Sequence, residues 1–263
     1  MSVPIESPRA ILCGDRELHV FHIKLADIPG ALLKVLTVFY SYGLNIVSVY
    51  TTELSYGDRQ EGEFNIVVDF TNKSVSPEQV GKSLSLQTVV KDVSFYGKQL
   101  PNMIIDEKHF PLLVMGARAV IFREDAYKSL ILGLRQQLGS AGEALLYHIG
   151  LNIGKGVWAA LKNLSGGNME LLNKYLKYWM LTLGASLVEE VSINLEKKRA
   201  VVRVENNYEC LLGKGSGKPF SNLHRGAFAG IFSELLGSEK SVETKCIAAG
   251  DPYCEFVIGD VEG

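Results

Sequence analysis

The chain contains 263 residues, of which 47% are hydrophobic and 21% are charged, and its formal net charge at pH 7 is −2. This composition excludes an intrinsically disordered chain and is sufficient for a buried core. The near-neutral balance excludes a general electrostatic attraction to nucleic acid or to an anionic membrane, so we expect neither as a direct partner. No apolar run reaches the roughly 20 residues that cross a bilayer.

The N-terminal residues lack the basic segment and the long apolar stretch of an export signal. The four cysteines are therefore expected in a reducing compartment, where burial or metal ligation is favoured over a disulfide. We predict a cytoplasmic protein. The length is sufficient for two domains, which we place at residues 1–100 and 101–263.

The first domain is predicted to follow the order βαββαβ. Alternating apolar residues and turn signals indicate strands at 18–25, 45–53, 64–70 and 89–97 and helices at 31–43 and after the cap Ser76. Antiparallel strands with two helices on one face form a ferredoxin-like α+β sandwich.

The loop D-I-P-G-A-L-L after the first strand and G-L-N-I at the start of the second resemble the ACT domain. The resemblance covers about a third of the chain and implies that an amino acid or similar metabolite binds at a dimer interface and regulates an attached partner. It implies ligand contacts from Asp27, Ile28, Pro29, Gly30 and Ala31, with Asn45 and Ile46 facing them.

The physical chemistry of this loop agrees with such a role. Gly30 has no side chain, so a ligand can approach the backbone, and the unpaired N–H groups of the following helix suit a carboxylate. The same residues are also a good helix entry, and an ACT-like fold can serve only as a dimerisation module. Both interpretations remain open at this point.

The second domain is predicted to be α+β, with helices packed on an antiparallel sheet. Helices are expected at 124–138, at 143–164 after a Ser140/Glu143 capping box, at 169–183 and at 223–237, with strand pairs at 187–208 and around Gly250. The glycines at 150, 154 and 156 lie along the second of these helices, where another backbone can pack closely.

A short stretch near the end of the chain holds half of its cysteine. Glu243 precedes Cys246 by three residues, and a Gly-Asp-Pro turn leads back to Cys254. The alternation on both sides of the turn predicts a hairpin that brings Cys246 and Cys254 together, with Glu243 at the rim. This arrangement fits a partial metal site, and it equally fits a packed core.

The order of helices, hairpin, G-A-F-A-G-I-F-S-E-L-L-G helix and V-E-T-K-C…A-A-G-D-P-Y-C-E-F resembles the 4-vinyl-reductase-type domain over residues 110–259. This small-molecule-binding module is related in fold to TRAPP trafficking subunits and to the sensory part of aromatic-responsive activators. The resemblance implies a structural zinc site that includes Glu243, Cys246 and Cys254. Ser221 stands where those sensors have a cysteine, so the fourth ligand here is either Cys210 or His224; zinc accepts the set with Cys210.

The helices of this domain carry aromatic residues that can line a ligand cavity or belong to the core. The predicted contacts are Tyr147, His148, Trp158 and Trp179, with Tyr147 and His148 as polar anchors. We therefore predict a homodimeric regulator that senses small molecules, an amino acid in the first half and an apolar or aromatic ligand in the second. The alternative is a TRAPP-like scaffold. No catalytic set is visible, so we predict that the protein is not an enzyme.

Overall fold

The computed structural model describes residues 4–51 and 60–260. The chain divides into two compact units, Met1–Leu113 and Val114–Gly263. The end of the predicted strand 45–53 and part of the loop after it lie outside the described residues. Across the described ranges, none of the helices combines the length and the apolar character that a membrane span needs.

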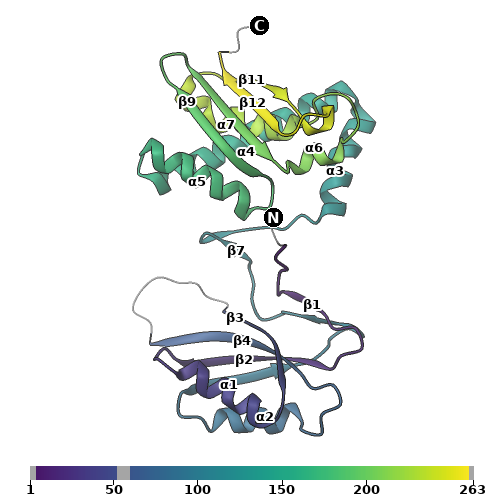
Figure 1. The fold of residues 1–263 in the computed structure, drawn as a ribbon, viewed down its shortest axis with the longest axis vertical. Helices are drawn as coiled ribbons and strands as arrows, with labels where there is room; N and C mark the ends of the chain where they lie inside the picture. Colours follow the sequence, from purple (N-terminus) through teal and green to yellow (C-terminus); the bar gives the residue numbers. More distant parts are fainter. Residues whose placement is uncertain (1–3, 52–59, 261–263) are drawn as a thin grey trace. The chain divides into compact units, whose positions relative to one another are not determined.

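The N-terminal unit contains a four-stranded antiparallel sheet in the order β3-β4-β2-β5. Its elements are β2 (Leu18–Ala26), α1 (Ala31–Ser41), β3 (Asn45–Thr51), β4 (Glu61–Asp69), α2 (Pro77–Ser85) and β5 (Val90–Tyr96). Figure 1 shows both helices on one face of the sheet. The predicted βαββαβ order is present, and Ser76 caps α2 in a capping box with Gln79.

The core of this unit follows the two-residue period of the strands. Phe21 and Ile23 of β2 face the helices, where they pack with Val35 and Phe39 of α1. The rings of Phe21 and Phe39 meet edge to face with centroids 5.2 Å apart. The side chains between them in the sequence, such as His22, therefore lie on the opposite face of the sheet.

That opposite face is covered by two short strands. β1 (Ala10–Leu12) pairs antiparallel with β6 (Met103–Ile105), and Ile104 packs with Leu18 and Val67. Residues 101–113 therefore belong to the N-terminal unit, and the division of the structure lies after the boundary predicted at residue 100. Beyond β6, the short strands β7 (Leu113–Val114) and β8 (Ala117–Arg118) pair with each other.

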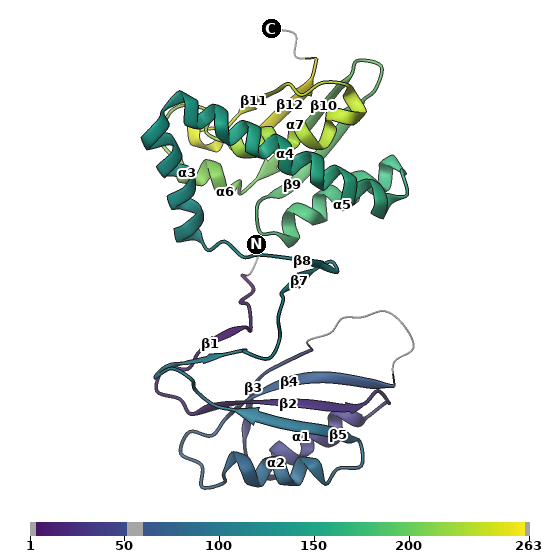
Figure 2. The same ribbon diagram turned by 180° about the vertical axis from the view of Figure 1, so that it is seen from behind.

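The C-terminal unit is built on an antiparallel sheet in the order β11-β12-β10-β9. Its elements are α3 (Glu124–Leu138), α4 (Ser140–Ser165), α5 (Met169–Thr182), β9 (Leu187–Asn194), β10 (Arg199–Glu205), α6 (Tyr208–Leu212), α7 (Asn222–Leu236), β11 (Ser241–Lys245), a 3₁₀ turn (Ile247–Ala249) and β12 (Cys254–Gly259). Figure 2 shows α4 crossing over α7, and α7 packs on the sheet through Phe228 and Phe256. The predicted α+β class is confirmed.

Helices α4 and α7 approach each other at the level of their backbones. A Cβ atom added to Gly154 would lie 2.0 Å from the carbonyl oxygen of Ala227, and one added to Gly226 would lie 2.0 Å from that of Tyr147. Gly150 of α4 is equally close to the backbone of α7. The close packing expected along α4 is therefore found at Gly150 and Gly154, whereas Gly156 faces open space.

The start of α4 differs from the prediction. Gly139 is its N-cap, without a side-chain cap, so Ser140 and Glu143 do not form a capping box. The reason is that the carboxylate of Glu143 is engaged by Arg135 of α3, with Nη1 and Oε1 2.7 Å apart. A charged partner on another helix outcompetes the local backbone contact.

Candidate metal centre

Three cysteines and one carboxylate converge behind the last hairpin of the C-terminal unit. Cys210, Glu243, Cys246 and Cys254 are all buried, and one donor atom from each lies within 4.8 Å of the other three. All three cysteines are free. The Sγ atoms of Cys210 and Cys246 are 3.3 Å apart, well beyond the length of a disulfide bond.

The hairpin places two of these thiols by a tight turn. The backbone N–H of Cys246 donates to Oδ2 of Asp251 at 2.8 Å, and the N–H of Asp251 donates back to the carbonyl of Cys246 at 3.1 Å. Between them Gly250 adopts a φ of 104°, which favours glycine. Cys254 then opens β12 opposite Val204 of β10, so both thiols are held by backbone pairing.

Cys210 reaches the cluster from the short helix α6. The fully buried Asn207 caps this helix by accepting hydrogen bonds from the backbone N–H groups of Glu209 at 3.1 Å and Cys210 at 3.5 Å. The sequence pattern predicts a strand and a loop here instead. The Asn207 cap is the available signal for the helix.

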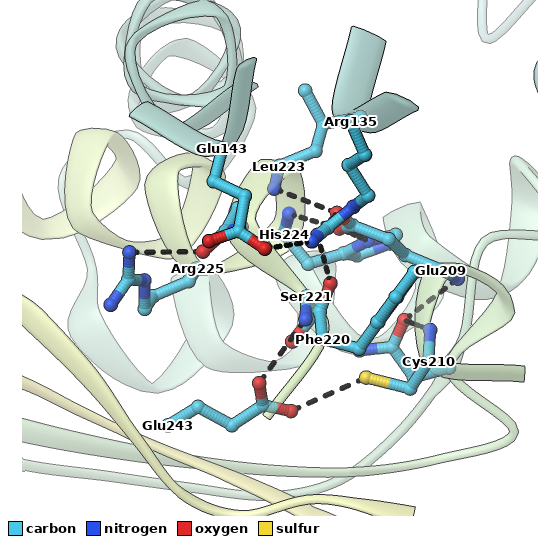
Figure 3. Close-up of polar contacts among 12 residues, drawn as sticks. Arg135, Glu143, Glu209, Cys210, Phe220, Ser221, Leu223, His224, Arg225 and Glu243 are labelled. Carbon is cyan, nitrogen blue, oxygen red and sulfur yellow. Dashed lines mark hydrogen bonds and ion pairs between the residues drawn. The ribbon is translucent and has the colours of Figure 1, made fainter. Parts of the chain in front are cut away.

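The glutamate joins the cluster to the start of α7. Oε1 of Glu243 lies 3.3 Å from Sγ of Cys210, and its Oε2 accepts the backbone N–H of Ser221 at 3.2 Å (Figure 3). The hydroxyl of Ser221 is buried without a hydrogen-bond partner. Ser221 therefore contributes its backbone to the site.

The two alternatives for the fourth ligand are separated by this geometry. Cys210 lies in the cluster, whereas His224 is turned toward Glu209, with Nδ1 and Oε2 3.2 Å apart. Three thiols and one carboxylate are donors that zinc accepts in a closed tetrahedral site. The residues present therefore fit a structural zinc ion.

Burial shapes the protonation of the metal-free cluster. Desolvation, together with the neighbouring Cys246, raises the pKa of Glu243 to about 7. The hydrogen bond to Cys246 and burial raise the pKa of Cys210, and the hydrogen bonds from Cys210 and Cys254 lower the pKa of Cys246. The four groups thus resist carrying several negative charges together, and a divalent cation removes that resistance.

A second buried polar network supports the cluster from the other side of α6. The fully buried carboxylate of Glu209 accepts the first-turn N–H groups of α7, from Leu223 at 3.0 Å and His224 at 2.9 Å (Figure 3). A carboxylate at a helix N-terminus is stabilised by both the free N–H groups and the helix dipole.

Arg135 closes this network by linking three elements. Its Nη2 lies 3.5 Å from Oε1 of Glu209 and donates to the carbonyl of Phe220 at 2.5 Å. Its guanidinium carbon lies 3.8 Å from the centroid of the Phe220 ring. Sequence reasoning misses Arg135 and Glu209 because no local pattern connects residues so far apart.

The predicted amino-acid site does not form within one chain. Gly30 does begin α1, with a φ of 83° and no side-chain cap. Asn45, however, pairs with Asp69 at one end of β4, whereas Ala26, just before the loop, pairs with Glu61 at the other end. At about 3.3 Å per residue these ends are roughly 26 Å apart, so Asn45 and Ile46 do not face the loop.

The four predicted aromatic contacts also lie at separate places. Tyr147 donates to the carbonyl of Glu239 and stacks with Arg225, and His148 is exposed. Trp158 is buried, and its Nε1 donates to Oε2 of Glu234 at 2.7 Å. Trp179 of α5 is half-buried, and its Nε1 has no hydrogen-bond partner. These residues therefore do not line one common cavity.

Comparison with known proteins agrees with the C-terminal assignment. Residues 200–260 match the 4-vinyl-reductase (V-4-R) domain, which confirms the resemblance for this part of the chain. An uncharacterized protein of Methanocaldococcus jannaschii, MJ0150, is 28% identical over 124 residues, 46% of this chain and 66% of that protein. The chain thus spans just under two thirds of this relative.

Solved structures give more distant likenesses. The phenol-responsive sensory domain of the transcription activator PoxR, solved with phenol, is 18% identical with a TM-score of 0.48, covering 55% of this chain and 78% of that domain. A trafficking protein particle complex subunit 3 from Naegleria fowleri, covalently bound to palmitic acid, is 17% identical with a TM-score of 0.37, covering 51% and 90%. The C-terminal domain of the MgtC protein from Mycobacterium tuberculosis is 15% identical with a TM-score of 0.25, covering 36% and 94%. The ACT resemblance stays a prediction.

Proposed function

We propose that the protein is a non-enzymatic regulator that senses small molecules, with a 4-vinyl-reductase-type unit kept in shape by a zinc ion. The observation that carries this proposal is the position of the metal centre. All four of its ligands, Cys210, Glu243, Cys246 and Cys254, lie within the residues 200–260 that match the domain family. In this proposal the metal joins α6 to the terminal hairpin and leaves no coordination position for chemistry.

In this proposal the C-terminal unit binds an apolar or aromatic ligand. One feature supports a polar anchor for it: Trp179 Nε1 is a buried donor without a hydrogen-bond partner. Such a donor costs free energy unless a carbonyl, hydroxyl or water accepts from it. A phenol or a fatty acid offers an acceptor of this kind at the end of an apolar body.

The N-terminal unit is proposed to bind an amino acid or a similar carboxylate at the loop 27–31. The start of α1 supports this, because Gly30 supplies no side chain to cap the first-turn N–H groups. Asn45 and Ile46 are not part of this proposal within one chain. Since the described cysteines are all free, we place the protein in a reducing compartment, the cytoplasm.

Ligand-dependent stabilisation of the full chain tests this function. We expect at least one of the twenty amino acids, and at least one phenol or fatty acid, to raise the melting temperature. A ligand at 100 times its Kd stabilises a protein by about 2.7 kcal/mol. Trp179→Phe should weaken only the apolar ligand. A screen in which neither panel shifts the melting temperature at millimolar concentration would contradict a sensing role.

The alternative function, a dimeric scaffold, is favoured by one specific observation. Leu145, Ile149 and Ile153 form an exposed apolar stripe along α4, at a spacing of one helical turn. The opposite side of α4 is in backbone contact with α7, which leaves no room for a ligand between these helices. In the scaffold alternative, a second copy of the chain covers the stripe and no ligand stabilises the protein.

A further inference from the structure

The N-terminal sheet carries an unusual group of polar side chains on the face away from its helices. Strand periodicity turns His22 of β2 and both Glu63 and Asn65 of β4 to this face. His22 and Asn65 are directly opposite each other in the strand register. They are 2% and 0% exposed, so their polar atoms are removed from solvent.

The segment after β6 brings a second histidine to the same place. The ring centroids of His22 and His109 are 5.2 Å apart, and Nε2 of His22 lies 3.7 Å from Oε2 of Glu63. One donor atom from each of His22, Glu63 and His109 lies within 4.8 Å of the other two. All three residues belong to the N-terminal unit.

Each histidine is oriented through its Nδ1 atom. Nδ1 of His22 donates to Oδ1 of Asn65 at 3.1 Å, and Nδ1 of His109 lies 2.8 and 2.9 Å from the carboxylate oxygens of Asp106. An acceptor at Nδ1 fixes the tautomer and leaves Nε2 with a free lone pair. Carboxylate and amide partners orient metal-binding histidines in this way.

An ordinary hydrogen-bond arrangement does not account for the group. The 3.7 Å between His22 and Glu63 is too long for a direct hydrogen bond. Nε2 of His109 is buried and has no hydrogen-bond partner. A buried nitrogen of this kind needs a partner, and a cation shared with Nε2 of His22 and the carboxylate provides one.

We propose that His22, Glu63 and His109 form a second metal site, for a divalent transition metal such as zinc. Two imidazoles and one carboxylate are a known donor set for this class of metal. Unlike the thiol cluster, the site provides three protein ligands, so one position is free for water or a small ligand. The side chains of Glu63 and His109 are 31% and 25% exposed, which gives that position access to solvent.

Counting zinc in the full-length protein tests the site. Wild type and variants are loaded with zinc, desalted, and analysed for metal and protein content. Glu63→Gln and His109→Ala should each lose one equivalent of zinc per chain relative to wild type. The thiol cluster contributes equally to every sample, so the difference reports on the N-terminal site alone.

Two further variants make the test specific. Glu61→Gln is the matched control, because Glu61 lies on the same strand but pairs with Lys24 at 2.7 Å, and it should keep the wild-type zinc content. Asp106→Asn keeps all three ligands and should weaken zinc affinity by about 10–100-fold. Circular dichroism confirms folding. Equal zinc contents in wild type, Glu63→Gln and His109→Ala would overturn the proposal.

Discussion

At the scale of single residues, the donor that completes the C-terminal metal centre is Cys210. Its thiol lies 3.3 Å from both Glu243 Oε1 and the Cys246 sulfur, whereas His224 is held by Glu209. The centre is buried, so a lost donor is not replaced by bulk water at low cost. The identity of this fourth ligand is therefore directly testable.

We expect Cys210→Ala to lose bound zinc from the C-terminal centre and His224→Gln to keep it. Removing a first ligand from a closed site leaves only three donors, whereas glutamine preserves the hydrogen bond from residue 224 to Glu209. Zinc analysis of both purified proteins is the measurement. Loss of zinc in His224→Gln with retention in Cys210→Ala would reverse the assignment.

The residues close together in the sequence were the ones that could be predicted. Glu243, Cys246 and Cys254 lie on one hairpin, so their spacing alone indicated a shared site. Cys210 was one of two alternatives for the fourth position and needed the fold to select it. His22, Glu63 and His109 come from three distant segments and have no local pattern, so sequence reasoning misses them.

At the scale of elements, the contact between α4 and α7 depends on glycine. We expect Gly154→Ala to destabilise the protein by about 1–3 kcal/mol or more, because its Cβ would lie 2.0 Å from the Ala227 carbonyl oxygen. Gly156→Ala, two residues along the same helix, meets nothing within 4 Å and should be neutral or stabilise by up to about 1 kcal/mol. Urea unfolding of both variants measures the difference, and equal destabilisation would contradict the packing.

The exposed stripe on α4 gives a prediction about assembly. If a second copy covers Leu145, Ile149 and Ile153, then Ile149→Lys places a charge in the interface and should convert the dimer to a monomer. Leu195→Lys is the control, because Leu195 is also exposed but lies between β9 and β10. Light scattering gives the mass. A dimer that survives Ile149→Lys would show that α4 is not its interface.

Element order was easier to predict than the relations between elements. The βαββαβ order and the long helices follow from periodicity and caps, and the structure contains them. The expected meeting of the Asp27 loop with Asn45 was wrong because it requires knowing which end of β4 each strand pairs with. The capping box at Ser140 was wrong because Arg135, on another helix, takes Glu143.

At the scale of the whole molecule, the two units have separate hydrophobic cores. The core of the N-terminal unit is formed around Phe21 and Phe39, and that of the C-terminal unit around Phe228 and Phe256. We expect Cys210→Ala to speed amide hydrogen exchange within residues 114–260 and to leave residues 4–51 and 60–113 unchanged. Exchange followed by peptide mass spectrometry measures this. Faster exchange throughout both units would show that they unfold together.

The most direct test of the central claim, that the buried thiol cluster is a metal centre, is X-ray absorption at the zinc edge. The sample is zinc-loaded protein carrying Glu63→Gln, so that only the C-terminal centre contributes. We predict three sulfur neighbours at about 2.3 Å and one oxygen at about 2.0–2.2 Å. A spectrum with only nitrogen and oxygen neighbours, or protein that retains no zinc, would contradict the claim.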